Sequence, residues 1–252
     1  MKNATKLITA VLAITALAAA SPALAVSLMT ETFTYPNGGL VAMSGGNWTN
    51  HSGTGTDITI ASGVANGDEA NAPDDNRTFA AQSATAKTYA CFKVTIPTPT
   101  GAGPIGQAYF AHFKDTGTTI FNARVFVAPS GTTFTFGITA GSSTTPTLWT
   151  SALNYNQAYY VVIDYNAATG VAELWVDPTL ETSPKISSSL PAGSTGTLVS
   201  AFALRQASLS AAAAWKFSVD DLGVGTSFAD ACISGPVPTV GTTWGRLKTI
   251  YR

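Results

Sequence analysis

Five polar and aromatic residues, spread over three alternating segments, could together recognise a sugar. They are Asn122 and Arg124 in one segment, Glu173 and Trp175 in a second, and Arg205 at the end of a third. Side chains two residues apart lie on the same face of a strand, so each pair shares a face. A tryptophan ring offers a stacking platform and the other residues offer hydrogen bonds, a combination that suits a pyranose ring. We therefore expect these residues to converge on one concave sheet as a carbohydrate-binding site.

Two of these residues could instead have a purely structural role. Trp175 could be a core residue, and Arg205 could form an ion pair with Glu173 or another acid. Trp48 and Trp149, which the sequence places at the edges of loops, are alternative stacking platforms.

The sequence shows no pair of carboxylates that could cleave a glycosidic bond. Retaining glycosidases hold two carboxyl groups about 5–5.5 Å apart. Glu173 and Asp177 share a strand face but stand roughly 13 Å apart at the rise of a strand. Asp220 and Asp221 are adjacent and therefore point to opposite faces. Hydrolysis is the weaker hypothesis.

A lyase would need a histidine or tyrosine base beside an arginine or glutamine that neutralises the substrate carboxylate. The chain has two histidines, His51 in a turn-like segment and His112 in an aromatic segment. We expect His112 to be a hydrogen-bonded strand residue and His51 to be solvated in a loop. No zinc-ligand spacing links them. The sequence therefore names no catalytic residue, and a polysaccharide-cleaving enzyme remains an alternative.

Segment 66–76 concentrates hard oxygen ligands of the kind that Ca²⁺ prefers. Its acidic residues are Asp68, Glu69, Asp74 and Asp75, which lack the spacing of an EF-hand. A solvated acidic loop is the alternative.

A second calcium hypothesis uses the two ends of the domain. If the first and last strands pair, Glu31 would approach Asp220 or Asp221. The alternative is an ion pair between Glu31 and Lys216. Structural calcium is the only cofactor that the sequence suggests.

The N-terminus predicts export. Lys2 and Lys6 precede an apolar stretch at 7–20, and Ala23-Leu24-Ala25 supplies a cleavage site, which together predict a signal peptide over 1–25. The stretch is too short to span a bilayer, which takes about 20 residues. Charged residues make up 11% of the chain and the net charge is −1, without the basic clusters of a nucleic-acid-binding protein. We expect a secreted or cell-surface protein with no membrane span and no nucleic-acid partner.

Two cysteines follow the signal peptide, and the oxidising conditions outside the cell favour a bond between Cys91 and Cys232. Alternation over 89–96 puts Phe92 on the core face and Cys91 beside Lys93 on the other face. The disulfide would pin the C-terminal part of the chain to the outside of the sheet. Two free, half-buried thiols are the alternative.

The rest of the sequence has the regularly spaced, strand-like segments of an all-β protein. Short segments rich in β-branched and aromatic residues, bounded by Gly, Pro, Asn or Ser, predict strands. They lie at 28–35, 56–61, 88–96, 107–114, 121–127, 133–139, 158–165, 171–177, 198–205 and 215–224. We expect residues 26–232 to form one two-sheet antiparallel β-sandwich.

Residues 233–252 change character. A proline-rich linker leads into a short amphipathic segment, from Trp244 to Tyr251, with apolar residues at helical spacing. The segment suggests a sorting or docking tag. The alternative is a terminus that packs its tryptophan on the domain.

Three segments carry a resemblance to a known family. They are Glu31-Thr32-Phe33, residues 160–165 with 170–178, and residues 219–225. The pattern resembles the concanavalin A-like lectin/glucanase superfamily, in particular the laminin-G-like jelly rolls of bacterial secreted proteins. The resemblance implies two curved antiparallel sheets with adjacent first and last strands. It implies activity only weakly, because members bind sugars, cleave them or act as spacers.

Together these features predict a secreted, non-catalytic module that binds extracellular polysaccharide or another cell-surface component. Two alternatives stay open. One is a cell-envelope or matrix structural protein without a sugar site, and the other is a glycosidase or lyase.

Overall fold

The computed structural model describes residues 26–101 and 103–232. The predicted signal peptide and the predicted amphipathic tail both lie outside the described residues.

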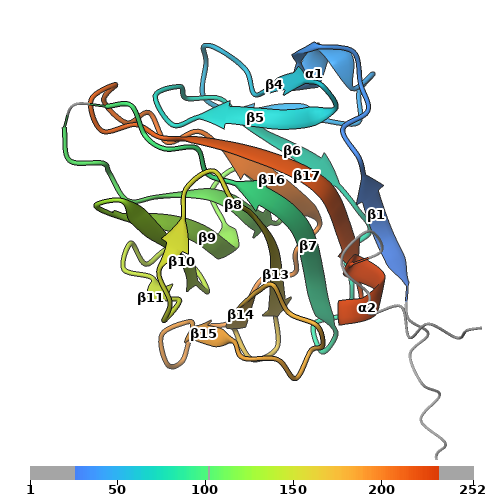
Figure 1. Cartoon of the computed structure of the whole chain (residues 1–252). Coiled ribbons are helices and arrows are strands. Elements are labelled where there is room, and N and C mark those ends of the chain that lie inside the picture. Colours follow the sequence, from blue (N-terminus) through green and yellow to red (C-terminus); the bar gives the residue numbers. More distant parts are fainter. Residues whose placement is uncertain (1–25, 102, 233–252) are drawn as a thin grey trace, which may run out of the picture.

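Two antiparallel sheets form the body of the protein (Figure 1). The first is nine-stranded, and its order is β15 (Ile186–Ser189), β14 (Val171–Val176), β13 (Ala158–Asn166), β7 (Lys87–Thr95), β17 (Lys216–Gly225), β5 (Val64–Asp68), β4 (Thr59–Ala61) and β2 (Gly38–Gly39), with β1 (Ser27–Glu31) paired to β17.

The second sheet is eight-stranded. Its order is β11 (Thr147–Leu148), β10 (Thr133–Thr139), β9 (Phe121–Ser130), β8 (Ala108–Lys114), β16 (Ala201–Arg205), β6 (Asp74–Thr78) and β3 (Thr49–Ser52), with β12 (Leu153–Asn154) paired to β10. The predicted all-β, two-sheet antiparallel sandwich is confirmed.

The core lies between the two sheets. Phe92 and Val94 of the nine-stranded sheet and Phe110 and Phe202 of the eight-stranded sheet are all completely buried. The rings of Phe92 and Phe202 have centroids 5.6 Å apart, so side chains of the facing sheets interdigitate. Alternation along each strand then leaves the intervening side chains on the outer faces of the sandwich.

All ten strands predicted from the sequence are present, with ends shifted by a few residues. The prediction that residues 66–76 form a loop is wrong at both ends. The first residues of this segment belong to β5 and the last belong to β6. Asn, Gly and Asp are depleted in strands, so local propensity argues against these two strands. Pairing of β5 with β17 and of β6 with β16 holds them extended instead.

The first and last strands are adjacent, as the family resemblance implies. Strand β1 pairs antiparallel with β17, and Glu31 stands opposite Leu222. Helix α1 (Leu40–Met43) follows β2, and helix α2 (Phe228–Ala231) follows β17. Ser227 caps α2 by accepting a hydrogen bond from the backbone N–H of Asp230. This short helix lies beside the end of β17, at the edge where β1 begins (Figure 1).

No helix within 26–101 or 103–232 is both long enough and apolar enough to cross a membrane.

Candidate functional site

The outer face of the eight-stranded sheet carries a stack of three side chains. In β8, Phe110 points into the core and Tyr109 points outward. The guanidinium carbon of Arg205, on β16, lies 4.1 Å from the centroid of the Tyr109 ring. The guanidinium carbon of Arg124, on β9, lies 4.8 Å from the same centroid. Cation–π attraction to one ring therefore holds two arginines in place.

Arg124 is fixed further by the backbone. Its Nε donates to the carbonyl of Gly141 at 2.7 Å, and its Nη2 donates to the carbonyl of Ser143 at 2.8 Å. Burial lowers the pKa of Arg124. Within the described parts of the chain, Arg124 forms no ion pair with a carboxylate. Arg205 does form one, with Asp74, whose Oδ2 lies 3.9 Å from Nε, so the alternative that Arg205 pairs with an acid other than Glu173 is confirmed. The positive charge of Arg124 is therefore the one in the stack without a paired carboxylate.

The two histidines lie beside this stack. The ring centroids of His51 and His112 are 6.0 Å apart, and His112 is 5.5 Å from Tyr109 and 4.5 Å from Phe121. All four ring nitrogens are buried, and none has a hydrogen-bond partner within the described residues. Burial lowers the pKa of His112 well below its usual value, and burial together with Lys114 lowers the pKa of His51 to about 4. Both imidazoles are thus neutral near pH 7.

These positions correct two expectations. His112 is not hydrogen-bonded within the described protein, and His51 is a half-buried residue of β3 rather than a solvated loop residue. The sequence could not show that β3 and β8, about sixty residues apart in the chain, lie in one sheet with β6 and β16 between them. A signal was present nonetheless, because Tyr109 and His112 sit in the same aromatic segment.

Asn122 lies on β9 of the same eight-stranded sheet. Its Nδ2 is buried and has no acceptor within the described residues. The guanidinium groups are donors that suit hydroxyl or carboxylate oxygens of a ligand, whereas the imidazole nitrogens and Nδ2 of Asn122 are buried beside them.

The structure does not bring the five predicted sugar-binding residues together. Asn122, Arg124 and Arg205 belong to the eight-stranded sheet, whereas Glu173 and Trp175 belong to β14 of the nine-stranded sheet. Alternation within a strand predicts which residues share a face, but it does not predict which sheet the strand joins. The two groups therefore lie in different layers of the sandwich.

Trp175 is not accessible as a stacking platform. It is completely buried in a small outer cluster with Tyr89 and Val162, and Phe228 of α2 packs against its ring at 5.8 Å. The amine of Lys185 covers the ring at 5.0 Å. Trp175 is therefore a packing residue, as the structural alternative expected, and not an open platform for a sugar ring.

Glu173 forms ion pairs rather than meeting Arg205. One carboxylate oxygen is 2.8 Å from Nζ of Lys87 and the other is 2.8 Å from Nζ of Lys185. These ion pairs lower the pKa of Glu173 despite its partial burial. Of the alternative platforms, Trp48 is completely buried and Trp149 packs partly buried against the core.

Glu31 is bound by groups of the protein rather than placed in a calcium site with Asp220 or Asp221. Its carboxylate accepts hydrogen bonds from the backbone N–H of Phe33 at 2.7 Å, the hydroxyl of Tyr35 at 2.7 Å, Nε1 of Trp48 at 2.9 Å and Nη1 of Arg77 at 2.6 Å. Asp221 sits at a bulge of β17, with a positive φ of 52°. The alternative pair of Glu31 with Lys216 is also wrong, because Lys216 lies 3.2 Å from Asp68.

The other predicted calcium ligands do not form a metal site in the described residues. Asp68 faces Lys216, and Asp74 accepts hydrogen bonds from Ser52 at 2.8 Å and from the backbone N–H of Gln206 at 3.2 Å. Glu69 is completely buried, and this burial raises its pKa well above the usual range. Of all the residues the structure describes, no three His, Cys, Asp or Glu side chains are grouped so that they could hold a metal ion.

Asp75 instead meets a residue that the sequence did not single out. It lies within hydrogen-bonding distance of Asp57, and burial together with this neighbour raises the pKa of Asp75 to about 8.

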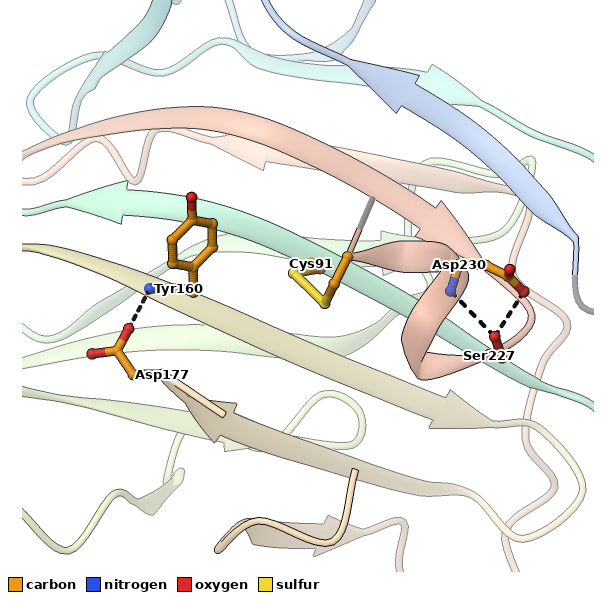
Figure 2. Close-up of a disulfide and its surroundings, with 6 residues drawn as sticks. Cys91, Tyr160, Asp177, Ser227 and Asp230 are labelled. Carbon is orange, nitrogen blue, oxygen red and sulfur yellow. Dashed lines mark hydrogen bonds between the residues drawn. A yellow bond between two sulfur atoms is a disulfide. The ribbon is translucent and has the colours of Figure 1, made fainter. Parts of the chain in front are cut away.

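The predicted disulfide between Cys91 and Cys232 is present (Figure 2). It joins β7 to the residue after α2, on the outer face of the nine-stranded sheet, as alternation predicts. Beside it lies an apolar cavity of about 340 Å³, bordered by Tyr160, Leu180 and Phe228 among others. The bond fixes the last described residue to the sheet.

No protein-family model and no curated protein matches the sequence. Among solved structures, the Lotus tetragonolobus seed lectin is similar at 13% identity, with 79% of this chain and 97% of the lectin covered and a TM-score of 0.47. Alginate lyase A1-II′, a member of polysaccharide lyase family-7, is similar at 10% identity, with 66% and 80% covered and a TM-score of 0.46.

The binding domain of botulinum neurotoxin serotype D is similar at 6% identity, with 80% of this chain and 48% of that chain covered and a TM-score of 0.46. This chain therefore spans about half the length of that structure. The two antiparallel sheets and the adjacent first and last strands that the sequence resemblance implies are both present in this structure. At these identities the similarity concerns the fold alone.

Proposed function

We propose that the protein is a secreted module that binds extracellular carbohydrate on the outer face of its eight-stranded sheet. The observation that carries the proposal is the stack of Arg124, Tyr109 and Arg205. Two guanidinium groups approach the Tyr109 ring, so the ring positions donors rather than stacking on a sugar. Rigid guanidinium groups bind hydroxyl or carboxylate oxygens in pairs, with geometric selectivity.

Two further features support a sugar as the ligand. The side chain of Arg205 is 22% exposed, so a ligand can reach its guanidinium group. Ile120 and Leu148, whose exposures are 43% each, lie in or beside the strands that border this face and could contact the apolar side of a sugar ring.

The test is affinity electrophoresis of the full chain in gels that contain soluble polysaccharides, both neutral and uronate-bearing. We expect at least one polysaccharide to retard the protein. Absence of retardation across a broad panel would overturn the proposal and favour a structural role in the cell envelope or matrix.

A second candidate function is cleavage of a uronate-containing polysaccharide by β-elimination. The specific observation is that Tyr109, His51 and His112 lie on one face with Arg124 and Arg205. A tyrosine that has given up its own proton can accept the proton next to a carboxylate that an arginine neutralises, and it can then return that proton to the sugar oxygen that leaves. An increase in ultraviolet absorbance from unsaturated uronate ends would establish the lyase, whereas retardation without that increase would establish binding alone.

A further inference from the structure

An apolar cavity of about 340 Å³ lies on the outer face of the nine-stranded sheet, beside the disulfide. It is bordered by residues of β7, β13 and α2 and by the segment that follows β14; among them are Cys91, Tyr160, Val162, residues 178–181 and Cys232. Figure 2 shows the ring of Tyr160 and the disulfide on the same side of β7 and β13, with α2 next to them. The cavity is separate from the proposed carbohydrate face, which belongs to the other sheet.

The apolar wall of this cavity reaches solvent. Leu180 is 59% exposed, more than any other large hydrophobic residue that the structure describes. Phe228 is only partly buried, although its ring packs against Tyr89 and Trp175 with centroids 6.5 Å and 5.8 Å away. Exposed apolar surface that lines a hollow is typical of a binding site. An apolar group that filled the cavity would remove this surface from water.

The chain itself continues from the border of the cavity. Cys232 lines the cavity, it is the last described residue, and its disulfide fixes it to Cys91 of β7. Trp244 follows twelve residues later. A flexible stretch of that length has a typical end-to-end distance of about 20 Å, so Trp244 can reach back to the cavity. Such a short tether also keeps the following residues near the cavity at an effective concentration in the millimolar range.

The segment from Trp244 to Tyr251 has the apolar pattern of a groove-binding helix. In a helix, Trp244, Leu247 and Tyr251 would stand at positions i, i+3 and i+7, which are the anchor positions with which an amphipathic helix fills an apolar groove. Isolated helices shorter than about 12–15 residues are marginal in water, so a segment of this length needs a surface to pack on.

Charge favours the same pairing. Arg246 and Lys248 lie between the apolar residues of the segment. Glu181, at the border of the cavity, accepts a hydrogen bond from the hydroxyl of Tyr89 at 2.6 Å. Within the described residues Glu181 takes part in no ion pair. A cation of the segment can therefore pair with it at the rim.

We propose that residues 244–251 dock into this cavity of their own chain, with Trp244 as the side chain that fills it. Docking covers Leu180 and Phe228, and Glu181 receives a cation. The disulfide has a second role in this arrangement, because it fixes the start of the tether at the border of the site.

Amide hydrogen exchange of the full chain, followed by mass spectrometry of the peptides that cover 244–251, tests the docking. With an effective concentration of about 1 mM and a Kd of about 0.1 mM, the docked state outnumbers the free state roughly tenfold. We therefore expect these amides to exchange about tenfold more slowly than in a free peptide of the same sequence.

Matched variants locate the site. Leu180→Lys puts a cation on the wall that repels Arg246 and Lys248, and the exposure of Leu180 allows the protein to fold, so the slow exchange should be lost. Leu198→Lys makes the same change at a leucine that is 42% exposed and lies outside the cavity, and it should keep the slow exchange. Trp244→Ala removes the anchor from the other partner and should lose the slow exchange while the amides of β7 stay protected.

Fast exchange of residues 244–251 in the wild-type chain would overturn the proposal. Slow exchange that persists in both Leu180→Lys and Trp244→Ala would overturn it as well, because the segment would then be held elsewhere. Slow exchange that disappears on dilution, together with a dimer in light scattering, would show that the segment docks into a second copy instead of its own chain.

Discussion

The guanidinium carbon of Arg205 lies 4.1 Å from the ring centroid of Tyr109, and Arg124 approaches the same ring at 4.8 Å. The tyrosine therefore serves as a spacer that fixes two cationic donors on one face of the sandwich. Under the proposed function, recognition at this face would depend on hydrogen bonds and charge rather than on an open aromatic platform.

Trp175→Ala should destabilise the protein without weakening carbohydrate binding. The ring is buried beneath Phe228 and Lys185, and truncating a buried tryptophan costs about 3–5 kcal/mol of unfolding free energy. Denaturant unfolding measures the cost, and affinity electrophoresis below the unfolding transition measures binding. Trp149→Ala, at a partly buried ring, is the matched control and should cost less. A folded Trp175→Ala variant that no longer binds would show that this ring does contact the sugar.

Loss of the disulfide should lower stability strongly. The bond between Cys91 and Cys232 closes a loop with a sequence separation of 141 residues. Chain-entropy models give up to about 5 kcal/mol for a loop of that length. We expect the double variant Cys91→Ala, Cys232→Ala and the reduced wild-type chain to unfold at similarly low denaturant concentration. Equal midpoints for oxidised and reduced wild-type protein would contradict this expectation.

The histidines should make the protein less stable in acid. The pKa of His51 is lowered from 6.5 to about 4, and that of His112 is lowered well below 6.5, because burial disfavours the charged form. Lys114, Arg124 and Arg205 oppose protonation of His112 further. As the pH falls below 6.5, the unfolded chain takes up protons that the folded chain does not. Stability present above that pH is thus lost, at up to about 1.4 kcal/mol per pH unit for His112.

Urea unfolding between about pH 7 and pH 5 checks this sign. Buried carboxyl groups such as Glu69, whose pKa is raised, contribute with the opposite sign, so the comparison needs a variant. His51→Gln keeps a polar side chain of similar length but does not titrate, and its stability should fall less steeply with acid than that of the wild type. Parallel slopes for the two proteins would show that His51 is not titrating as expected.

Much of the fold can be predicted from the sequence. Alternation and β-branched runs predict ten of the strands, and the same alternation places Cys91 outside the core. Strands β5 and β6 escape such prediction over most of their length because their Asn, Gly and Asp residues favour loops, and only pairing with distant strands holds them extended.

The candidate site is predictable in part. Asn122, Arg124 and Arg205 do lie in one sheet, but Tyr109 and the histidines join them through pairings between segments far apart in the chain. Alternation also points to Trp175, because its polar neighbours are suitably spaced, although its strand belongs to the other layer. Asp57 stands alone in sequence, and its relation to Asp75 exists only in three dimensions.

The most direct test of the carbohydrate site compares two substitutions against the polysaccharide that retards the wild-type chain most. Arg205→Met removes a cation from the stack with Tyr109, and Lys185→Met removes one from the outer face of the other sheet. Losing hydrogen bonds to a charged group costs about 1.5–3 kcal/mol, so we expect Arg205→Met to bind roughly 10- to 150-fold more weakly while Lys185→Met binds like the wild type. Unchanged binding by a folded Arg205→Met variant would contradict the proposed site.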